Sequence, residues 1–138
     1  MRRIDIYFLL LAATSLVAGV VLGIWMGIAH DFQFMPVHAH LNLLGWASLA
    51  LFGLVYRAYP GLARTRLAAV HFTLAAVSAL VFPVGIALAV TNVTVAVAIV
   101  ASLLWLGGAV TFLANLVRLL AAPAVGTAAG IVAERMPA

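Results

Sequence analysis

The sequence contains no cysteine and very little charge: 7 basic and 3 acidic residues in 138, or 7% of the chain. The absence of cysteine excludes disulfides, thiolate metal sites, iron–sulfur clusters and covalently attached c-type haem. A soluble domain carries charge on about a quarter of its residues, whereas this chain is 67% hydrophobic with a mean hydropathy of +1.28. A water-soluble globular enzyme and a disordered chain are therefore both excluded.

The basic residues are all arginine and mark the ends of long apolar runs. They are scattered and not interleaved with aromatic residues, so no nucleic-acid partner is expected. Runs of about 20 apolar residues, long enough to cross the core of a lipid bilayer, occur four times. The predicted spans are residues 6–28, 37–56, 67–90 and 93–116. The predicted fold class is an all-α integral membrane protein with a single membrane domain over residues 1–138, in which the tail 121–138 has no assigned chemistry.

The arginines also predict an orientation, because short arginine-rich loops stay on the cytoplasmic side of a membrane. In a four-span chain all seven fall on one side: Arg2, Arg3, Arg57, Arg64, Arg66, Arg118 and Arg135. Both termini are therefore expected inside, in a bacterial inner membrane. The first apolar run is longer than the roughly 7 to 15 residues of a secretory signal, so it is interpreted as a retained helix. Twin-arginine export is the alternative, although the rest of that signal is missing.

Small residues recur every four positions in the first span, at Ser15, Gly19, Gly23 and Gly27. They form one narrow stripe on which another helix backbone can approach closely. The stripe predicts helix packing, either within one chain or between subunits.

The four histidines are the main candidates for chemistry, because ionisable residues inside a bilayer are costly. His30, His38 and His40 lie towards the outer surface, and Pro36 suits the first position of the second helix. His38 and His40 are two residues apart, so on a helix their side chains point about 200° apart. They cannot chelate one metal together, but one helix can present them to two sites, one on each flank.

Neutral imidazole is a good axial ligand for haem iron, and small residues beside it leave room for the macrocycle. Gly45 would supply such room and Trp46 would line the porphyrin. Asn42, four residues after His38, would orient the His38 ring. The alternative is that His38 and His40 lie at the membrane interface, hydrogen-bonded to water and to carbonyl groups.

The stretch Pro36-Val-His-Ala-His-Leu-Asn-Leu-Leu-Gly-Trp46 resembles the His-x-His helix of haem–copper oxidase subunit I, including the cbb3-type oxidases and nitric oxide reductases. In that family the two histidines ligate two different haems, one on each flank of the helix. The resemblance covers residues 36–60, and the rest of the chain agrees only in topology and hydropathy.

The family's subunit has twelve helices in three quasi-equivalent groups of four, with its low-spin haem between the second helices of adjacent groups. The resemblance therefore implies a minimal four-helix member of the family. A homotrimer would rebuild the twelve-helix architecture. His38 of one protomer and His40 of its neighbour would then be the two axial ligands of each haem b.

The sequence also departs from that family. Its copper centre needs an adjacent His-His pair, which is absent here, so a copper cofactor and dioxygen reduction are disfavoured.

His71 is expected near the inner side, roughly 15 Å from His40 along the membrane normal. It is interpreted either as a buried hydrogen-bonded residue or as a second haem or metal ligand. His30, beside Asp31, is interpreted as solvated, or as a partner of a metal or haem propionate. Pro83 is expected to kink the third span.

These observations favour a membrane-embedded haem b protein that transfers electrons, with a redox partner, or binds a diatomic gas such as O2 or NO. Whether it is an oxidoreductase that turns over a substrate is left open. Two alternatives are kept. One is a cofactor-free membrane assembly module, and the other is a protein that handles copper or haem through His30, His38 and His40.

Overall fold

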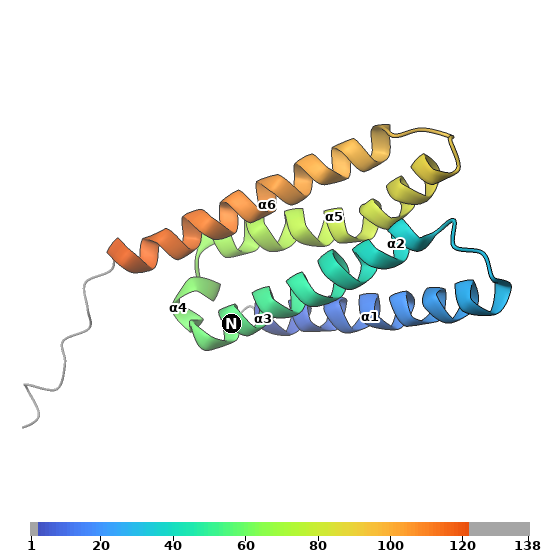
Figure 1. Cartoon of the computed structure of the whole chain (residues 1–138). Coiled ribbons are helices and arrows are strands. Elements are labelled where there is room, and N and C mark those ends of the chain that lie inside the picture. The colour runs from blue at the N-terminus through green and yellow to red at the C-terminus, as the bar shows by residue number, and fades with distance from the viewer. Residues whose placement is uncertain (1–2, 122–138) are drawn as a thin grey trace, which may run out of the picture.

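The computed structural model describes residues 3–121, which are helical throughout apart from short connections and contain no strand. Four helices long and apolar enough to cross a membrane form an elongated bundle (Figure 1). They are α1 (Ile4–Ala29), the continuous span Met35–Ala58, α5 (Arg66–Val90) and α6 (Ala96–Ala121). The predicted all-α fold with four spans is therefore confirmed.

The second span is built from three segments. It starts as α2 (Met35–His40), continues as η1 (Leu41–Ser48), a π-helical stretch, and ends as α3 (Leu49–Ala58). A short helix, α4 (Pro60–Ala63), then turns the chain into α5. Helix α2 begins at Met35, one residue before the predicted start at Pro36, and Pro36 lies in its first turn, where the missing N–H costs nothing.

Two of the spans end at residues with a left-handed backbone conformation. His30 has φ 53° and its N–H donates to the Met26 carbonyl, which ends α1, and Asn92 has φ 58° just after α5. The Thr94 hydroxyl then accepts a hydrogen bond from the backbone of Ala96 at 3.2 Å. This local cap delays the start of α6 to Ala96, whereas hydropathy alone predicts a start at residue 93. Pro83 lies inside α5, which continues as one helix to Val90.

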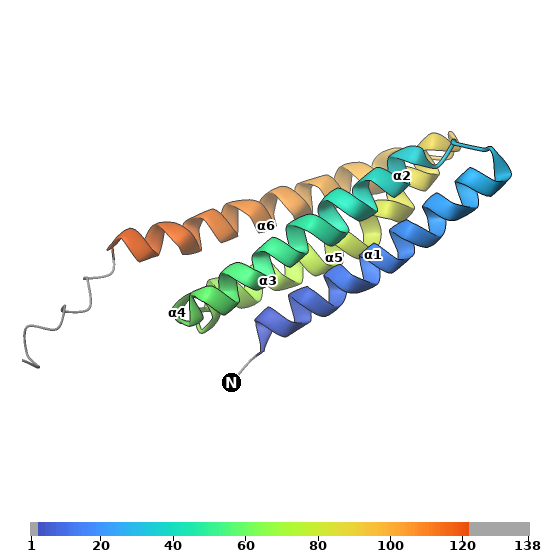
Figure 2. The same ribbon diagram turned by 60° about the horizontal axis from the view of Figure 1, so that its bottom comes forward.

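The helices pair as two hairpins, which Figure 2 shows from a second side. The first hairpin packs α1 along the second span, and the second packs α5 along α6. In the second hairpin, the Ser78 hydroxyl donates to the Ala101 carbonyl at 2.7 Å. Close by, Gly85 lies directly against the backbone of Ala98. The α5 residues Ser78 and Gly85 thus contact the α6 backbone directly, an approach that only small side chains allow.

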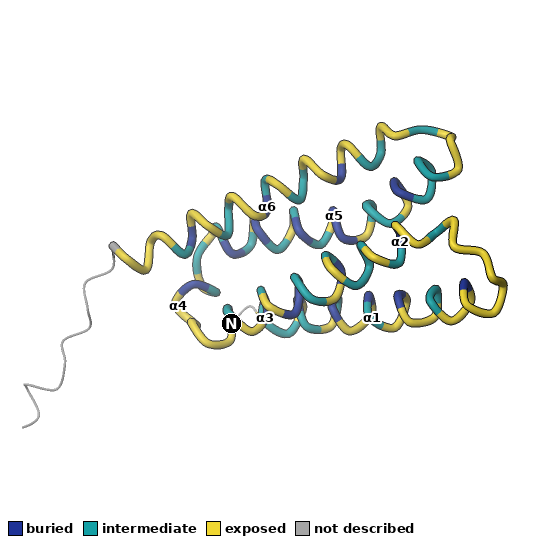
Figure 3. The backbone as a smooth tube through the Cα atoms, in the orientation of Figure 1, coloured by how far each residue is buried: buried dark blue, intermediate teal, exposed yellow. Residues whose placement is uncertain are grey.

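Buried residues line the seam between the helices, while most of the outer surface is exposed and apolar (Figure 3). The core includes Phe8, Leu49 and Tyr56, which are almost completely buried where the first half of α1 packs against α3. Asn115 of α6 is also fully buried. Its amide accepts from the Thr65 hydroxyl at 3.0 Å and donates to the Leu62 carbonyl at 3.3 Å. These bonds hold α6 against the connection between α4 and α5.

The described arginines gather at one end of the bundle. Arg3, Arg57, Arg64 and Arg66 line one cavity there, and Arg118 lies in the last turn of α6, beyond the Asn115 contact. The predicted one-sided distribution is thus confirmed for these five, and Arg2 and Arg135 lie outside the described residues, as does the tail after residue 121.

Candidate functional site

His38 and His40 lie on opposite flanks of the second span, as their spacing predicts. The His38 ring faces α1, where a Cβ added to Gly23 would lie 2.8 Å from its Cε1 atom. The His40 ring faces α5 and stacks on Phe82, with ring centroids 5.1 Å apart and planes inclined by 28°. One helix therefore presents two imidazoles to two different neighbours.

Both imidazoles are held through Nδ1 by a backbone carbonyl. His38 Nδ1 lies 2.9 Å from the Gly19 oxygen, and His40 Nδ1 lies 2.7 Å from the Pro36 oxygen. A carbonyl oxygen only accepts, so in the neutral ring Nδ1 carries the hydrogen and Nε2 keeps its lone pair. Metal-ligating histidines are oriented in this way by a second partner on the other ring nitrogen. Both rings therefore keep Nε2 as an acceptor, and the carbonyl bonds agree equally with the alternative of hydrogen-bonded histidines near the membrane interface.

The two Nε2 atoms differ in access. The Asn42 amide donates to the His38 carbonyl at 2.8 Å and lies 3.4 Å from His38 Nε2, so that nitrogen has a neighbour within its own chain. Within residues 3–121 no such partner contacts His40 Nε2, and this ring is partly exposed on the side of the bundle. His40 is the more accessible ligand, and Asn42 lies where the sequence predicts a partner for His38.

The stripe of small residues on α1 packs within the chain. Gly19 lies against the Asn42 amide and Gly23 against His38, while Ser15 fills the space beside Gly45. The room that Gly45 provides is thus occupied by α1 in this structure. The Trp46 side chain is 37% exposed and lies at the surface of the bundle.

The π-helical segment η1 begins directly after His40 and was not anticipated from the sequence. The Asn42 side chain bonds the His38 carbonyl, which is the acceptor that its own backbone N–H would use in an α-helix. At the other end the Ser48 hydroxyl donates to the Leu43 carbonyl, five residues earlier. Such wide turns are rare and are frequently found at functional sites. Here the wide turns follow immediately on the paired histidines.

His71 is fully buried at the opposite end of the bundle. Its Nδ1 lies 2.9 Å from the Tyr56 hydroxyl, while Phe8, Phe52 and Phe112 surround the ring. Its Nε2 is buried and has no partner among the described residues. The interpretation of His71 as a buried, hydrogen-bonded residue agrees with this environment.

His71 and His40 cannot share a ligand. His40 stacks on Phe82, which lies eleven residues beyond His71 on α5, or about 16 Å along the helix. The separation predicted from hydropathy is therefore confirmed. His30 is exposed in the connection between α1 and α2, next to Asp31, whose carboxylate accepts from the Gln33 backbone.

A directly chelated metal ion is not supported by these positions, because no group of three His, Asp or Glu side chains converges in the described part of the chain. Haem iron makes a smaller demand, since the porphyrin supplies four nitrogens and the protein only one or two axial ligands. The donor set at His38 and His40 therefore fits haem better than a free metal ion.

No family model, curated protein or solved structure matches the chain. The likeness to haem–copper oxidase subunit I consequently stays a resemblance of the His-x-His stretch.

Gly23→Ala is expected to displace the His38 ring. The new Cβ would lie 2.8 Å from Cε1 and 3.2 Å from Nδ1, so the ring must move away from its bond to Gly19. Overpacking of this kind costs roughly 1–3 kcal/mol. The ¹⁵N chemical shifts of the His38 ring, measured by solid-state NMR, should report the change. Gly27→Ala, one turn along α1 where nothing lies within 4 Å, is the control and should leave those shifts unchanged. Unaltered shifts in Gly23→Ala would contradict the contact.

Proposed function

We propose that the protein is a membrane-embedded haem b protein in which His40 provides an axial ligand through Nε2. The observation that carries the proposal is the fixing of both Nδ1 atoms by backbone carbonyls, which leaves two Nε2 lone pairs on one helix. The partial exposure of His40 on the flank of the bundle makes it the first ligand that a cofactor outside the helices would reach.

His38 is proposed as the second axial ligand, contributed by a neighbouring protomer in a homotrimer. Its Nε2 has only the 3.4 Å contact with the Asn42 amide, and that side chain keeps its stronger bond to the His38 carbonyl. A small rotation of Asn42 would release Nε2 without loss of the 2.9 Å bond to Gly19. The His40 ring stacks on Phe82 and is only half-buried, so we propose that a second copy of the chain covers the exposed side of a group held there.

Haem b, when bound, supplies a one-electron iron couple. Ligation of one haem by both His38 and His40 would favour electron transfer. If His38 and His40 instead served separate haems, binding of O2 or NO would become possible. We propose the bacterial inner membrane as the location, with the arginine end of the bundle on the cytoplasmic side.

The two alternatives are less well supported by the geometry. A copper-handling role needs several converging donors, and none converge within residues 3–121. The alternative of a cofactor-free assembly module requires the small-residue stripe of α1 to form a subunit interface. In the structure, Ser15, Gly19 and Gly23 of this stripe pack within the chain.

The test is a reduced-minus-oxidised absorption spectrum of protein purified after haem-replete expression. Absorption bands of b-type haem support the proposal if each oligomer binds at least one haem. A colourless protein overturns it. Native mass spectrometry of the coloured protein separates the oligomeric states. A trimer supports the shared ligation of each haem, whereas a monomer that carries bis-histidine haem excludes it.

A further inference from the structure

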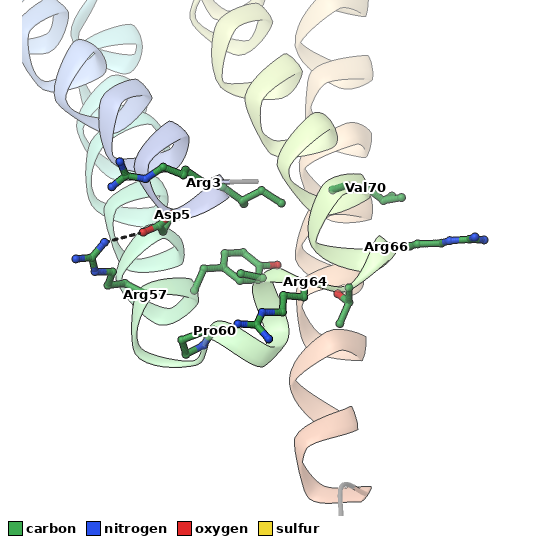
Figure 4. Close-up of a pocket in the computed structure, with 12 residues that line it drawn as sticks. Arg3, Asp5, Arg57, Pro60, Arg64, Arg66 and Val70 are labelled. Atoms are coloured by element: carbon green, nitrogen blue, oxygen red, sulfur yellow. Dashed lines mark hydrogen bonds and ion pairs between the residues drawn. The ribbon is translucent and has the colours of Figure 1, made fainter. Parts of the chain in front are cut away.

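A large open cavity lies at the arginine end of the bundle, about 25 Å along the second span from His40. It has a volume of about 970 Å³ and opens between the start of α1, the end of α3, the short helix α4 and the start of α5 (Figure 4). No histidine lines it. It is therefore separate from the proposed haem ligands.

The cavity carries excess positive charge. Four arginines and one acidic residue line it. Asp5 is paired with Arg57 at 3.1 Å, and among the described residues this is the one ion pair. Arg3, Arg64 and Arg66 thus have no anionic partner within residues 3–121. Figure 4 shows Arg64 in the middle of the opening and Arg66 extending outward beside α5.

A smaller, mostly apolar groove adjoins the cavity on the side towards the middle of the bundle. A second cavity of about 310 Å³ is lined by Ile4, Tyr7, Ala69, Phe72 and Thr73 and shares Ile4 and Ala69 with the first. Both α1 and α5 begin at the arginine end, so Tyr7 and Phe72 lie one turn deeper than the shared residues. The groove therefore runs between the two hairpins, in the direction that a lipid chain takes in a bilayer.

We propose that these two cavities bind one anionic phospholipid. The phosphate and its negatively charged headgroup lie at Arg64, with Arg3 and Arg66 at the rim, and one acyl chain enters the groove past Ala69. Arginine suits this role because its planar guanidinium binds phosphate through two parallel hydrogen bonds. A zwitterionic headgroup is a poorer fit, because its cationic part would be repelled by Arg64 and by the positive charge of Arg3 and Arg66 on either side of the opening. The lipid would fill the gap between the hairpins and join them.

The test compares phospholipid binding to the full-length protein by native mass spectrometry, with phosphatidylglycerol and phosphatidylcholine as probes. We expect one tightly held phosphatidylglycerol per chain and weaker retention of phosphatidylcholine. Each arginine near an anionic lipid contributes about fivefold in affinity, so Arg64→Gln should weaken retention by about that factor. The double variant Arg64→Gln/Arg66→Gln should weaken it roughly 25-fold on the same basis.

Two further variants separate the site from general surface charge. Arg118→Gln removes an exposed arginine at the same end of the bundle that does not line the cavity, and it should bind like the wild type. Ala69→Phe keeps every charge but blocks the passage between the two cavities, so it should lose the lipid. Circular dichroism establishes that each variant keeps its helical content.

Three results would overturn the proposal. Equal loss in Arg118→Gln and Arg64→Gln would indicate attraction to surface charge, and equal retention of the two lipids would remove the role of the headgroup. Displacement of phosphatidylglycerol by inorganic phosphate at the same concentration would indicate a simple anion site without a lipid chain.

Discussion

Under the proposed haem ligation, replacement of His40 by alanine is expected to remove most of the haem from the purified protein. His40 lies on the α5 side of the second span and is half-buried, with Nδ1 anchored at 2.7 Å to the Pro36 carbonyl and no hydrogen-bond partner at Nε2 within residues 3–121. Loss of a partner that merely orients a metal-binding histidine costs 10- to 100-fold in affinity, so loss of the ligand itself should cost more than about tenfold. The haem-to-protein ratio from the pyridine haemochrome assay measures the effect.

His38→Ala is expected to act differently. If His38 and His40 share one haem, this variant keeps one ligand and should change a six-coordinate low-spin spectrum into a high-spin spectrum. If each serves its own haem, about half of the pigment should disappear without a spin change. Electron paramagnetic resonance of the oxidised protein distinguishes the two outcomes.

Two control variants test the same assignment. His30→Ala removes an exposed histidine from the neighbouring loop, and His71→Phe replaces the buried histidine, at the far end of the bundle, with a ring of similar shape. Both should retain the haem-to-protein ratio of the wild type. Loss of pigment in His71→Phe with normal helicity would show that the ligand assignment is wrong.

Gly85→Ala is expected to destabilise the second hairpin more than any other glycine substitution in it. The new Cβ would lie 2.6 Å from the Ala98 nitrogen and 2.8 Å from its Cα, and backbone atoms cannot move aside as a flexible side chain can. The two helices must separate, which weakens the neighbouring bond from Ser78 to the Ala101 carbonyl. We expect a loss of about 3 kcal/mol in the free energy of unfolding, measured by titration with a denaturing detergent.

Gly107→Ala is the matched control for this prediction. It adds the same methyl group on α6 at the same pair of helices, but its nearest neighbour is Leu74 Cδ1 at 3.6 Å, an ordinary contact. Alanine is also the better helix former by roughly 0.5–1 kcal/mol, so stability should be unchanged or slightly higher. Equal losses in the two variants would mean that close approach at Gly85 is not what limits this hairpin.

Hydropathy and charge were enough to predict the four spans, because the bilayer requires each helix to be long and apolar. They were not enough for the ends of the helices. The start of α6 depends on the left-handed Asn92 and on the Thr94 cap, whose effects are local and do not alter the average hydropathy. The opposite directions of His38 and His40 follow from their spacing, and the structure confirms them.

Other parts of the site depend on contacts between distant segments. Asn42 was identified as a neighbour of His38 from its spacing of four, but the fixing of His38 by the Gly19 carbonyl requires α1 to lie alongside. The pairing of Tyr56 with His71 likewise joins two helices. The arginine cavity is formed jointly by residues of α1, α3, α4 and α5, so the sequence predicts its charge but not its shape.

The π-helical segment η1 determines the rotational phase between the two halves of the second span. A π-turn holds one residue more than an α-turn, and one residue corresponds to about 100° of rotation. Deletion of a single residue between Leu41 and Ser48 would allow an α-helix to form, but it would turn His38 and His40 by about that angle relative to α3. The wide turns therefore set the rotation of α2 relative to α3. This rotation lets α3 pack in the core at Tyr56 while His38 faces α1 and His40 faces α5.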